Sequence, residues 1–368
     1  MDKHLALKTP PPQKILIIAM RFLGDVLLAT PLIHSIRLAH PKAKIDVLIY
    51  NNTAAMIEGN PDIDEAITTP ERPKLSDYKT LYKQIFRKYD LSIVTQTNDR
   101  RLLYGILAAP TRIAFTPKRD QKGWWKRYLT QAWTEFEPFN NHTVLELLKL
   151  SSLMNIEPNT YLVPPVLKTN SHTKKQLNLP PQYAVLHVYP QWQYKRWTTT
   201  GWSEVAHHLN KHGITPILSG SSAQDERTYI SRLQPYLPSN TINLAGQLTL
   251  AELTHIIQHS KLFIGPDTGI THLAAATGVP VIAIYGPTNP VIWGPWPYAY
   301  KLPLPPYKKT GNQTVNNIHL VQGKASCIPC QEEGCDKHRK SYSHCLDTLP
   351  STDIKHVINN IITTTKGS

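Results

Sequence analysis

A short turn near the start of the chain, residues 20–25 (M-R-F-L-G-D), places a carboxylate where chemistry is possible. The turn follows an apolar run that we expect to be a buried strand, and Asp25 lies at the start of a predicted helix. A carboxylate there is favoured by the helix dipole, and it could act as a general base or simply cap the helix. The turn alone favours capping without deciding between the two roles. It lacks the G-x-G-x-x-G pattern, so we predict no dinucleotide site here.

Two later turns carry the residue types that bind a diphosphate. Residues 189–197 (Y-P-Q-W-Q-Y-K-R-W) contain Lys195, which could meet phosphate oxygens or lie in a solvated basic loop. Residues 265–276 (G-P-D-T-G-I-T-H-L-A-A-A) offer glycines for close backbone approach and a helix start that forms an anion site. Asp267 in this turn can accept hydrogen bonds from sugar hydroxyls. Together the two turns predict a nucleotide-diphosphate site in the second half of the chain.

A fourth turn, residues 220–226 (G-S-S-A-Q-D-E), offers two further carboxylates. Either Asp225 or Glu226 could accept hydrogen bonds from ribose hydroxyls. Either could equally be an exposed carboxylate at a helix start. The sequence leaves this choice open.

The four cysteines lie close together near the end of the chain, with the spacing C-x2-C-x4-C-x9-C, at Cys327, Cys330, Cys335 and Cys345. Four soft ligands at this density suit a structural zinc knuckle, although the spacing departs from the paired C-x2-C…C-x2-C form. The alternative is a set of reduced or adventitiously oxidised thiols. No set of carboxylates accompanies them, so we expect no catalytic metal.

The strands that would present these turns recur with helices in a βαβ rhythm. We expect strands at residues 15–19, 45–50, 91–94, 183–188, 215–218, 262–264 and 279–285. Helices are expected at residues 26–39, 81–88, 202–212, 250–259, 272–277 and 353–364. The pattern predicts an α/β fold of two Rossmann-like domains with parallel sheets facing a central cleft. A Pro-rich linker places the domain boundary between residues 165 and 166.

Composition indicates an ordinary folded protein with an anionic partner. The 368 residues are 41% hydrophobic and 18% charged, and 40 Lys and Arg against 26 Asp and Glu give a formal charge of +14. Nucleic acid, an acidic membrane surface or a phosphorylated substrate would each satisfy that charge. No apolar run approaches the roughly 18 residues of a membrane span, and the run at 15–20 is too short for a secretory signal, so we expect a cytoplasmic protein.

The segments as a set resemble the lipopolysaccharide heptosyltransferases of glycosyltransferase family 9. The resemblance is carried by residues 14–31, 195–197, 265–280 and 285–290 (Y-G-P-T-N-P), and the late cysteine cluster is also similar to one in this family. Residues 14–31 and 43–50 look most like the branch that adds the third heptose of the inner core. The resemblance implies the GT-B fold, with residues 1–165 binding the acceptor, 166–350 binding the donor, and 351–368 forming a helix that packs back on the first domain.

The resemblance also implies a reaction and roles for its residues. It implies inverting transfer of L-glycero-D-manno-heptose from ADP-heptose to the lipopolysaccharide inner core, without cofactor or catalytic metal. Asp25 matches the general base, and Lys195 matches the residue that stabilises the departing diphosphate. The donor would contact the remaining motif residues, which are Asp267, Thr268, Gly269 and His272, with Asp225 or Glu226 at the ribose.

With that family in view, the positive charge suggests a phosphorylated glycolipid acceptor at the cytoplasmic face of the inner membrane. The expected contact is a basic segment with interleaved Trp124 and Trp125, made of Lys118, Arg119, Lys122, Lys126 and Arg127. A solvated basic loop is the competing interpretation. The competing functions are heptosyltransferase I or II, another family 9 glycosyltransferase, a nucleotide-sugar epimerase and a nucleic-acid-binding protein.

Overall fold

The computed structural model describes residues 11–137, 139–167 and 178–366. The contacts within the chain group it into two compact units. Unit 1 comprises Met1–Pro165 and Lys301–Pro305, and unit 2 comprises Val166–Tyr300 and Pro306–Ser368. The boundary predicted from the sequence lies between residues 165 and 166, with residues 301–305 in the second domain.

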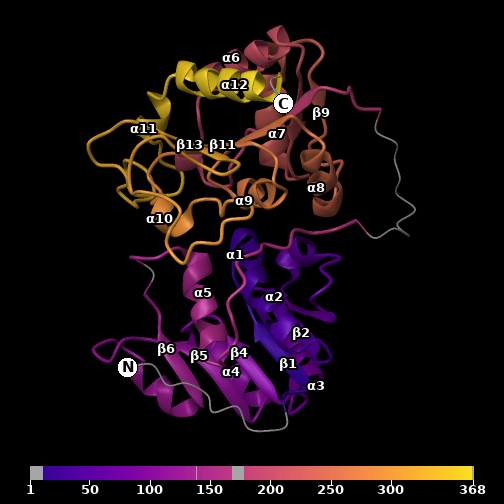
Figure 1. The fold of residues 1–368 in the computed structure, drawn as a ribbon, viewed down its shortest axis with the longest axis vertical. Helices are drawn as coiled ribbons and strands as arrows, with labels where there is room; N and C mark the ends of the chain where they lie inside the picture. Colours follow the sequence, from indigo (N-terminus) through magenta and orange to yellow (C-terminus); the bar gives the residue numbers. More distant parts are fainter. Residues whose placement is uncertain (1–10, 138, 168–177, 367–368) are drawn as a thin grey trace. The chain divides into compact units, whose positions relative to one another are not determined.

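Unit 1 is built on a parallel sheet with the strand order β3-β2-β1-β4-β5-β6 (Figure 1). The strands are β1 (Lys14–Ile18), β2 (Lys44–Tyr50), β3 (Glu65–Thr69), β4 (Leu91–Val94), β5 (Thr111–Thr116) and β6 (Ala132–Glu135). β1 pairs with both β2 and β4, so the strand order reverses direction beside β1. Open parallel sheets bind ligands at such switch points, beyond the carboxyl ends of the strands.

Helices cover both faces of this sheet. α2 packs with α5, and α3 packs with α4. The bounds are α1 (Leu23–Leu28), α2 (Thr30–Ala39), η1 (Asn51–Ile57), α3 (Leu75–Ile85), α4 (Asp99–Ala108), η2 (Trp124–Leu129) and α5 (Thr143–Ser152). The single helix expected at 26–39 is wrong, because the chain breaks between α1 and α2. Pro31 lacks an N–H and its ring clashes with the carbonyl four residues earlier, while the Thr30 hydroxyl donates to the Leu27 carbonyl at 2.7 Å.

Unit 2 contains a second sheet, with the order β12-β13-β11-β10-β7-β8-β9. The strands are β7 (Tyr183–His187), β8 (Thr215–Ser219), β9 (Ile242–Asn243), β10 (Leu262–Pro266), β11 (Val281–Tyr285), β12 (Gln313–Val315) and β13 (Ile318–Gln322). β7 pairs with β8 and β10, which makes β7 and β10 the switch point. β12 pairs antiparallel with β13, and the other pairings described are parallel.

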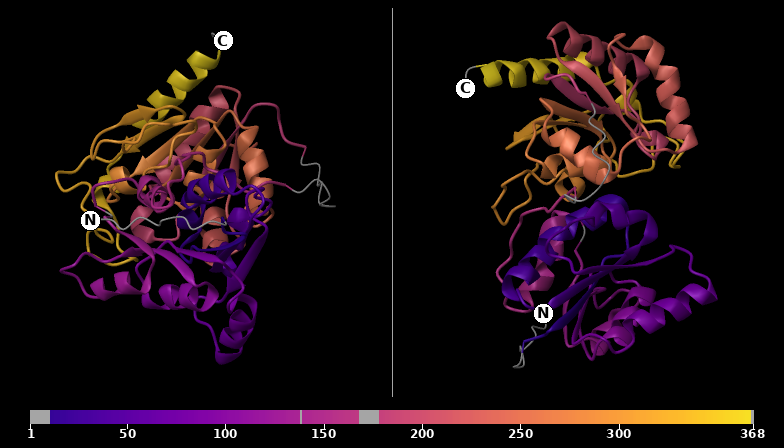
Figure 2. Two further views of the ribbon diagram at one scale, coloured as in Figure 1. Left: turned by 60° about the horizontal axis from the view of Figure 1, so that its bottom comes forward. Right: turned by 90° about the vertical axis from the view of Figure 1, so that its right-hand side faces the viewer.

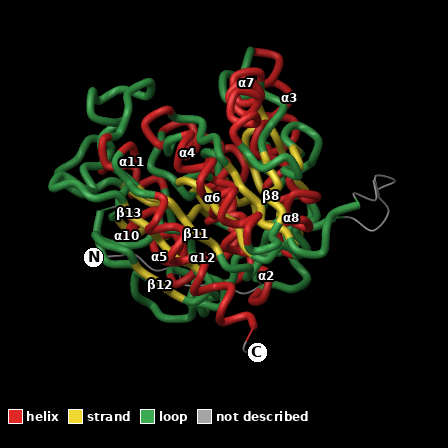
Figure 3. Tube along the Cα trace, turned by 90° about the horizontal axis from the view of Figure 1, so that it is seen from above, coloured by secondary structure: helices red, strands yellow, loops and turns green. Residues whose placement is uncertain are grey.

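Two apolar clusters lie on opposite faces of the second sheet. One contains residues of α6, α7 and α12, and the other contains residues of α8 and α9. Long loops surround α10 and α11 (Figure 3). The bounds are η3 (Gln193–Lys195), α6 (Thr199–Lys211), α7 (Gln224–Leu233), η4 (Gln234–Tyr236), α8 (Leu250–Gln258), α9 (Gly269–Ala276), α10 (Pro290–Trp293), α11 (His344–Asp347) and α12 (Ser351–Lys366). Among the described residues, no helix has the length and apolar character that a membrane span needs.

The C-terminal helix α12 packs within unit 2, where Figure 2 shows it in yellow. It contacts α6 and β13, and Ile354 and Ile358 are fully buried in the cluster that includes α6. Lys355 Nζ lies 2.8 Å from Glu204 Oε2 of α6. The family resemblance implied that residues 351–368 pack on the first domain, whereas these contacts are with the second unit.

Candidate active site

An ion pair lies at the switch point of the unit 2 sheet. Lys195, in the loop that follows β7, places its Nζ 2.5 Å from Oδ2 of Asp267, the residue directly after β10. Both side chains are largely buried, at 19% and 9% exposed. The β7 and β10 strands are neighbours and parallel, so their carboxyl ends bring together two residues that are 72 apart in sequence. The sequence singled out both residues but did not predict that they pair.

Asp267 accepts hydrogen bonds from two hydroxyl groups that were not predicted from the sequence. Thr288 donates to Asp267 Oδ2 at 2.5 Å, and Tyr285 donates to Oδ1 at 3.3 Å. Burial opposes the charge of Asp267, but Lys195 and the Thr288 hydrogen bond outweigh it, so the pKa of Asp267 is lowered. Tyr285 is the last residue of β11, the parallel neighbour of β10, and Thr288 lies in the loop that follows, within the Y-G-P-T-N-P segment. Their position at the carboxyl end of an adjacent parallel strand was the signal that could have predicted them.

The Lys195 loop is fixed by its two neighbouring residues. Trp197 is buried against Trp202, and its Nε1 donates to the Leu349 carbonyl at 3.0 Å. Gly201 makes room for the indole, because a Cβ there would lie 2.5 Å from the Trp197 ring. The Arg196 guanidinium lies over the Tyr189 ring, 4.3 Å from its centroid. In K-R-W, Lys195 is therefore the candidate phosphate-binding cation, and the two residues that follow it fix the loop in place.

The turn from β10 into α9 has the features of an anion site and lies next to Lys195 and Asp267. Thr268 caps α9, and its Oγ1 accepts from the Thr271 N–H at 3.4 Å. Gly265 permits the close packing of β10 on α9, because a Cβ there would lie 2.7 Å from the Phe263 ring and 2.9 Å from Thr271 Oγ1. The N-terminus of a helix attracts phosphate through its N–H groups and dipole. The expected motif residues Thr268 and Gly269 form this helix start.

Two buried histidines lie near the same strand ends. His187 ends β7 and contacts Ser219 Oγ at 3.3 Å, while His272 lies in the first turn of α9. Burial lowers the pKa of each to about 4. Asp267 opposes this lowering at His272 without overcoming it. Both imidazoles are therefore neutral near pH 7.

We expect these histidines to make the protein acid-sensitive. The unfolded imidazole takes up a proton near pH 6.5, whereas the folded one does so near pH 4. The stability present above pH 6.5 is thus lost as pH falls towards 4, by about 2 kcal/mol per histidine at pH 5. Thermal unfolding at pH 7 and pH 5 should show a smaller loss for His187→Gln than for the wild type. Equal losses in the two proteins would contradict the assignment to His187.

The two carboxylates of the β8–α7 turn have different surroundings. Asp225 is exposed and accepts from the Tyr189 hydroxyl at 3.0 Å, a hydrogen bond that lowers the pKa of Asp225. Glu226 is buried and accepts from the Ser221 hydroxyl at 2.5 Å, and burial raises the pKa of Glu226. A Cβ at Gly220 would lie 2.7 Å from Glu226 Oε1, so this turn packs closely on the carboxylate.

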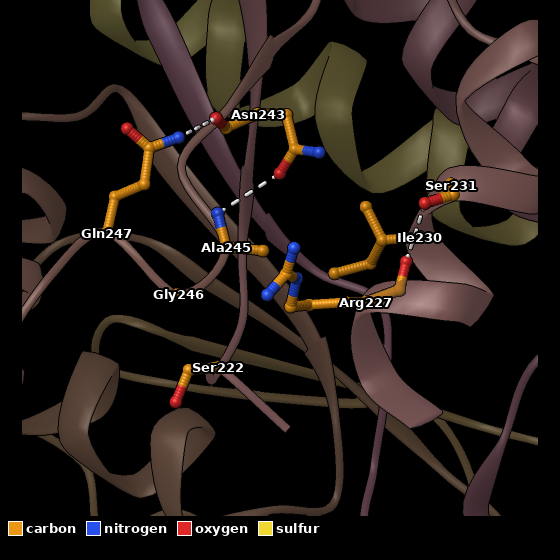
Figure 4. A pocket seen from close by; sticks show the side chains of 8 residues that line it. All are labelled: Ser222, Arg227, Ile230, Ser231, Asn243, Ala245, Gly246 and Gln247. Atoms are coloured by element: carbon orange, nitrogen blue, oxygen red, sulfur yellow. Dashed lines mark hydrogen bonds between the residues drawn. The ribbon is translucent and has the colours of Figure 1, made fainter. Parts of the chain in front are cut away.

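A pocket of 390 Å³ lies next to this turn, between α7 and the loop after β9 (Figure 4). The Arg227 side chain points across it toward Ala245. Gly246 has φ +74°, and a Cβ there would lie 3.1 Å from Ser222 Cα, so a bulkier residue would crowd the wall. The lining offers hydroxyl, amide and guanidinium groups and comprises Ser222, Arg227, Ile230, Ser231, Asn243, Ala245, Gly246 and Gln247.

Asp25 lies in unit 1, in the helix that follows the switch-point strand β1. It is the third residue of α1, whose N-cap is Phe22, so the capping interpretation is wrong. Its Oδ1 lies 3.3 Å from Arg21 Nε, and its side chain is 12% exposed. A carboxylate in the first turn of a helix is stabilised in its charged, basic form.

The sequence left two interpretations of the four cysteines open, a structural zinc knuckle and a set of thiols without metal. All four are free thiols, with Cys327 and Cys335 exposed and Cys345 buried. The His344 N–H donates to Cys335 Sγ at 3.4 Å. Burial and the neighbouring cysteines raise the pKa of Cys345 to about 12. Within the described residues, no three His, Cys, Asp or Glu side chains are arranged to hold a metal ion.

The basic segment 118–127 differs from the expected open surface. Lys126 and Arg127 are buried, with Lys126 paired to Asp99 and Arg127 Nη2 lying 3.4 Å from Glu135. Lys118 Nζ lies 3.0 Å from Glu137 Oε1. Three of the five cations are therefore neutralised by carboxylates, which corrects the expectation of five charges facing a membrane. Trp124 and Trp125 remain partly exposed.

Known proteins resemble the chain over most of its length. The sequence profile of glycosyltransferase family 9 (heptosyltransferase) matches residues 79–335. Lipopolysaccharide heptosyltransferase 3 of Escherichia coli is 30% identical over 292 residues, which cover 75% of this chain and 84% of that protein. The structure of E. coli ADP-heptose lps heptosyltransferase II has a TM-score of 0.72 at 18% identity, covering 96% and 99% of the two chains. E. coli heptosyltransferase WaaC with ADP has a TM-score of 0.69 at 18% identity, covering 95% and 99%.

Proposed function

The chain belongs to glycosyltransferase family 9, the heptosyltransferases, and we propose that its donor is ADP-heptose and that it adds the third inner-core heptose. It is a glycosyltransferase of lipopolysaccharide core synthesis, and it has the GT-B fold. The observation that carries the donor assignment is the Lys195–Asp267 pair beside the start of α9. Two of the similar structures support ADP, one being an ADP-heptose enzyme and the other holding ADP. The E. coli heptosyltransferase 3 relative supports the third heptose.

The strand order of unit 2 suggests how an extended nucleotide-sugar would lie. The loops after β10, β7, β8 and β9 follow one another along one edge, because these neighbouring strands are parallel. The heptose would contact Asp267, and the diphosphate would lie between Lys195 and the N-terminus of α9. The ribose would then meet Glu226 or Asp225, and the adenine would enter the pocket of Figure 4. A volume of 390 Å³ is within the range of small-molecule sites.

The proposed reaction is a single displacement with inversion. An acceptor hydroxyl oxygen attacks the anomeric carbon of ADP-L-glycero-β-D-manno-heptose, and the bond from that carbon to the phosphate oxygen breaks. The hydroxyl proton passes to the Asp25 carboxylate, and both bonding electrons leave with ADP. Lys195 and the α9 N-terminus stabilise the negative charge that develops on the diphosphate. His272, neutral near pH 7, adds no charge to the donor site.

The acceptor in this proposal is a phosphorylated glycolipid, which brings the enzyme to the cytoplasmic face of the inner membrane as a peripheral protein. The formal charge of +14 supports an anionic partner. No nucleic acid is needed to account for it.

The experiment that tests the acceptor assignment is ADP release from ADP-heptose with a panel of purified inner-core lipids carrying no, one or two heptoses. We expect release to depend on the acceptor and to be fastest with two heptoses. Release only with a shorter acceptor would replace the third-heptose assignment with heptosyltransferase I or II. Conversion of the nucleotide-sugar without any acceptor would favour an epimerase instead.

A further inference from the structure

Unit 1 carries an apolar groove that the proposed reaction does not use. It has a volume of 860 Å³ and lies between α3 and α4, on one face of the unit 1 sheet. Apolar and aromatic side chains form its floor and walls, among them Leu81, Tyr82, Ile85, Leu103 and Tyr104. Tyr82 is 44% exposed and Leu103 is 52% exposed. An open apolar surface of this kind marks a contact site.

The helix α3 leaves most of its surface uncovered, which creates one wall of the groove. Two of its residues, Leu81 and Ile85, are buried. These two residues are one helical turn apart and attach α3 to unit 1, while the neighbouring tyrosines, Tyr78 and Tyr82, are exposed. Tyr82 and Phe86 stack with ring centroids 4.5 Å apart, and both are partly exposed. The aromatic surface therefore continues beyond the groove along α3.

The charge around the groove has a single dominant sign. Residues 78–88 (Y-K-T-L-Y-K-Q-I-F-R-K) contain four cations and no acidic residue. Lys79 and Lys83 line the groove from α3, and Arg100 lines it from α4. Asp99 is the acidic lining residue, and it is ion-paired with Lys126. An occupant that contacts both the apolar walls and this rim must have apolar and anionic parts.

We propose that the α3–α4 groove and the exposed side of α3 dock the enzyme on an anionic lipid bilayer. Tyrosines beside lysines at the edge of an apolar surface are the side chains that settle at the boundary between lipid headgroups and acyl chains. Lys79, Lys83 and Arg87 attract the anionic headgroups, and the apolar walls receive the acyl-chain region. Residues 118–127 offer few free cations, because carboxylates neutralise most of them. The surface of α3 supplies cations instead. The inference extends the proposed function, since its acceptor is a lipid, but binding can be measured without any reaction.

The test is sedimentation of the full-length enzyme with vesicles of phosphatidylethanolamine and phosphatidylglycerol, compared with vesicles of phosphatidylcholine. We expect binding to the anionic vesicles that weakens as salt is raised. Two paired variants separate the two contributions: Lys79→Glu with Lys83→Glu, and Tyr82→Ser with Leu103→Ser. Each pair should lower the partition coefficient at least about tenfold. The matched controls in unit 2, Lys308→Glu with Lys309→Glu and Tyr236→Ser, should bind as the wild type does.

A water-soluble acceptor, the deacylated inner-core oligosaccharide, keeps this result distinct from the proposed function. ADP release with that acceptor should be the same in the wild type and in both groove variants, which also shows that they are folded. Vesicle binding that is unaffected by both groove variants would overturn the proposal, as would a wild type that binds no vesicles. A change of oligomeric state in the groove variants, with vesicle binding intact, would also overturn it and assign the groove to a second copy of the chain.

Discussion

Replacing Lys195 with alanine is expected to slow heptosyl transfer by about 10³-fold, the size of effect seen when one charge-stabilising group is lost from a developing anion. The loss should fall mainly on kcat, because the charge on the leaving diphosphate grows in the transition state. Lys195 also neutralises Asp267, which burial would otherwise penalise. Steady-state kinetics with the soluble acceptor measure the effect on kcat and KM separately.

Controls separate this catalytic loss from unfolding. Lys261→Ala removes an exposed lysine of unit 2 and should leave the rate unchanged. Lys195→Arg keeps a cation beside Asp267 and should restore the thermal stability of the wild type while recovering part of the rate. A folded Lys195→Ala enzyme with wild-type kcat would remove Lys195 from the reaction.

Replacing Asp25 with asparagine is expected to lower kcat by about 10³-fold, within the range for loss of a general base. The amide keeps the shape of the side chain but cannot take up the proton of the attacking acceptor hydroxyl. The affinity for ADP, measured by calorimetry, should change little, because the groups assigned to the nucleotide diphosphate lie in unit 2.

Asp77→Asn is the matched control for this variant. Asp77 occupies the same third position of α3 that Asp25 occupies in α1, and it accepts from the Lys74 N–H at 2.7 Å. Both substitutions therefore remove an acidic group from the first turn of a helix in unit 1. If Asp77→Asn lost as much activity as Asp25→Asn, the effect would come from helix stability and not from proton transfer.

The sequence predicted β1, β2 and β4 of the first sheet and β7, β8, β10 and β11 of the second, because these strands are short apolar runs that end in recognisable turns. It missed β3, β5, β6, β9, β12 and β13. The run at 91–94, for example, is β4 with the same bounds. The long helix after β1 was wrong because periodicity continued through Pro31, and the break depends on a local backbone clash. Asp267 was found from its turn, but its partners Thr288 and Tyr285 required the pairing of β10 with β11.

The sequence could not show which basic side chains are paired with carboxylates. Lys126 and Arg127 counted as surface charges until the structure placed Asp99 and Glu135 beside them. The apolar groove was equally hidden, because α3 has the composition of an ordinary amphipathic helix. Only Leu81 and Ile85 of α3 are buried, because α4 packs beside α3 and leaves the rest of the helix surface uncovered.

Transfer of the third heptose can be observed by analysing the acceptor after incubation of the wild-type enzyme with ADP-heptose and inner-core lipid that carries two heptoses. Mass spectrometry and the anomeric coupling in the NMR spectrum together define the product. We expect an acceptor heavier by one heptosyl residue, joined by an α linkage, with one ADP released for each transfer. An unmodified acceptor despite consumption of the donor, or a β-linked product, would contradict this expectation.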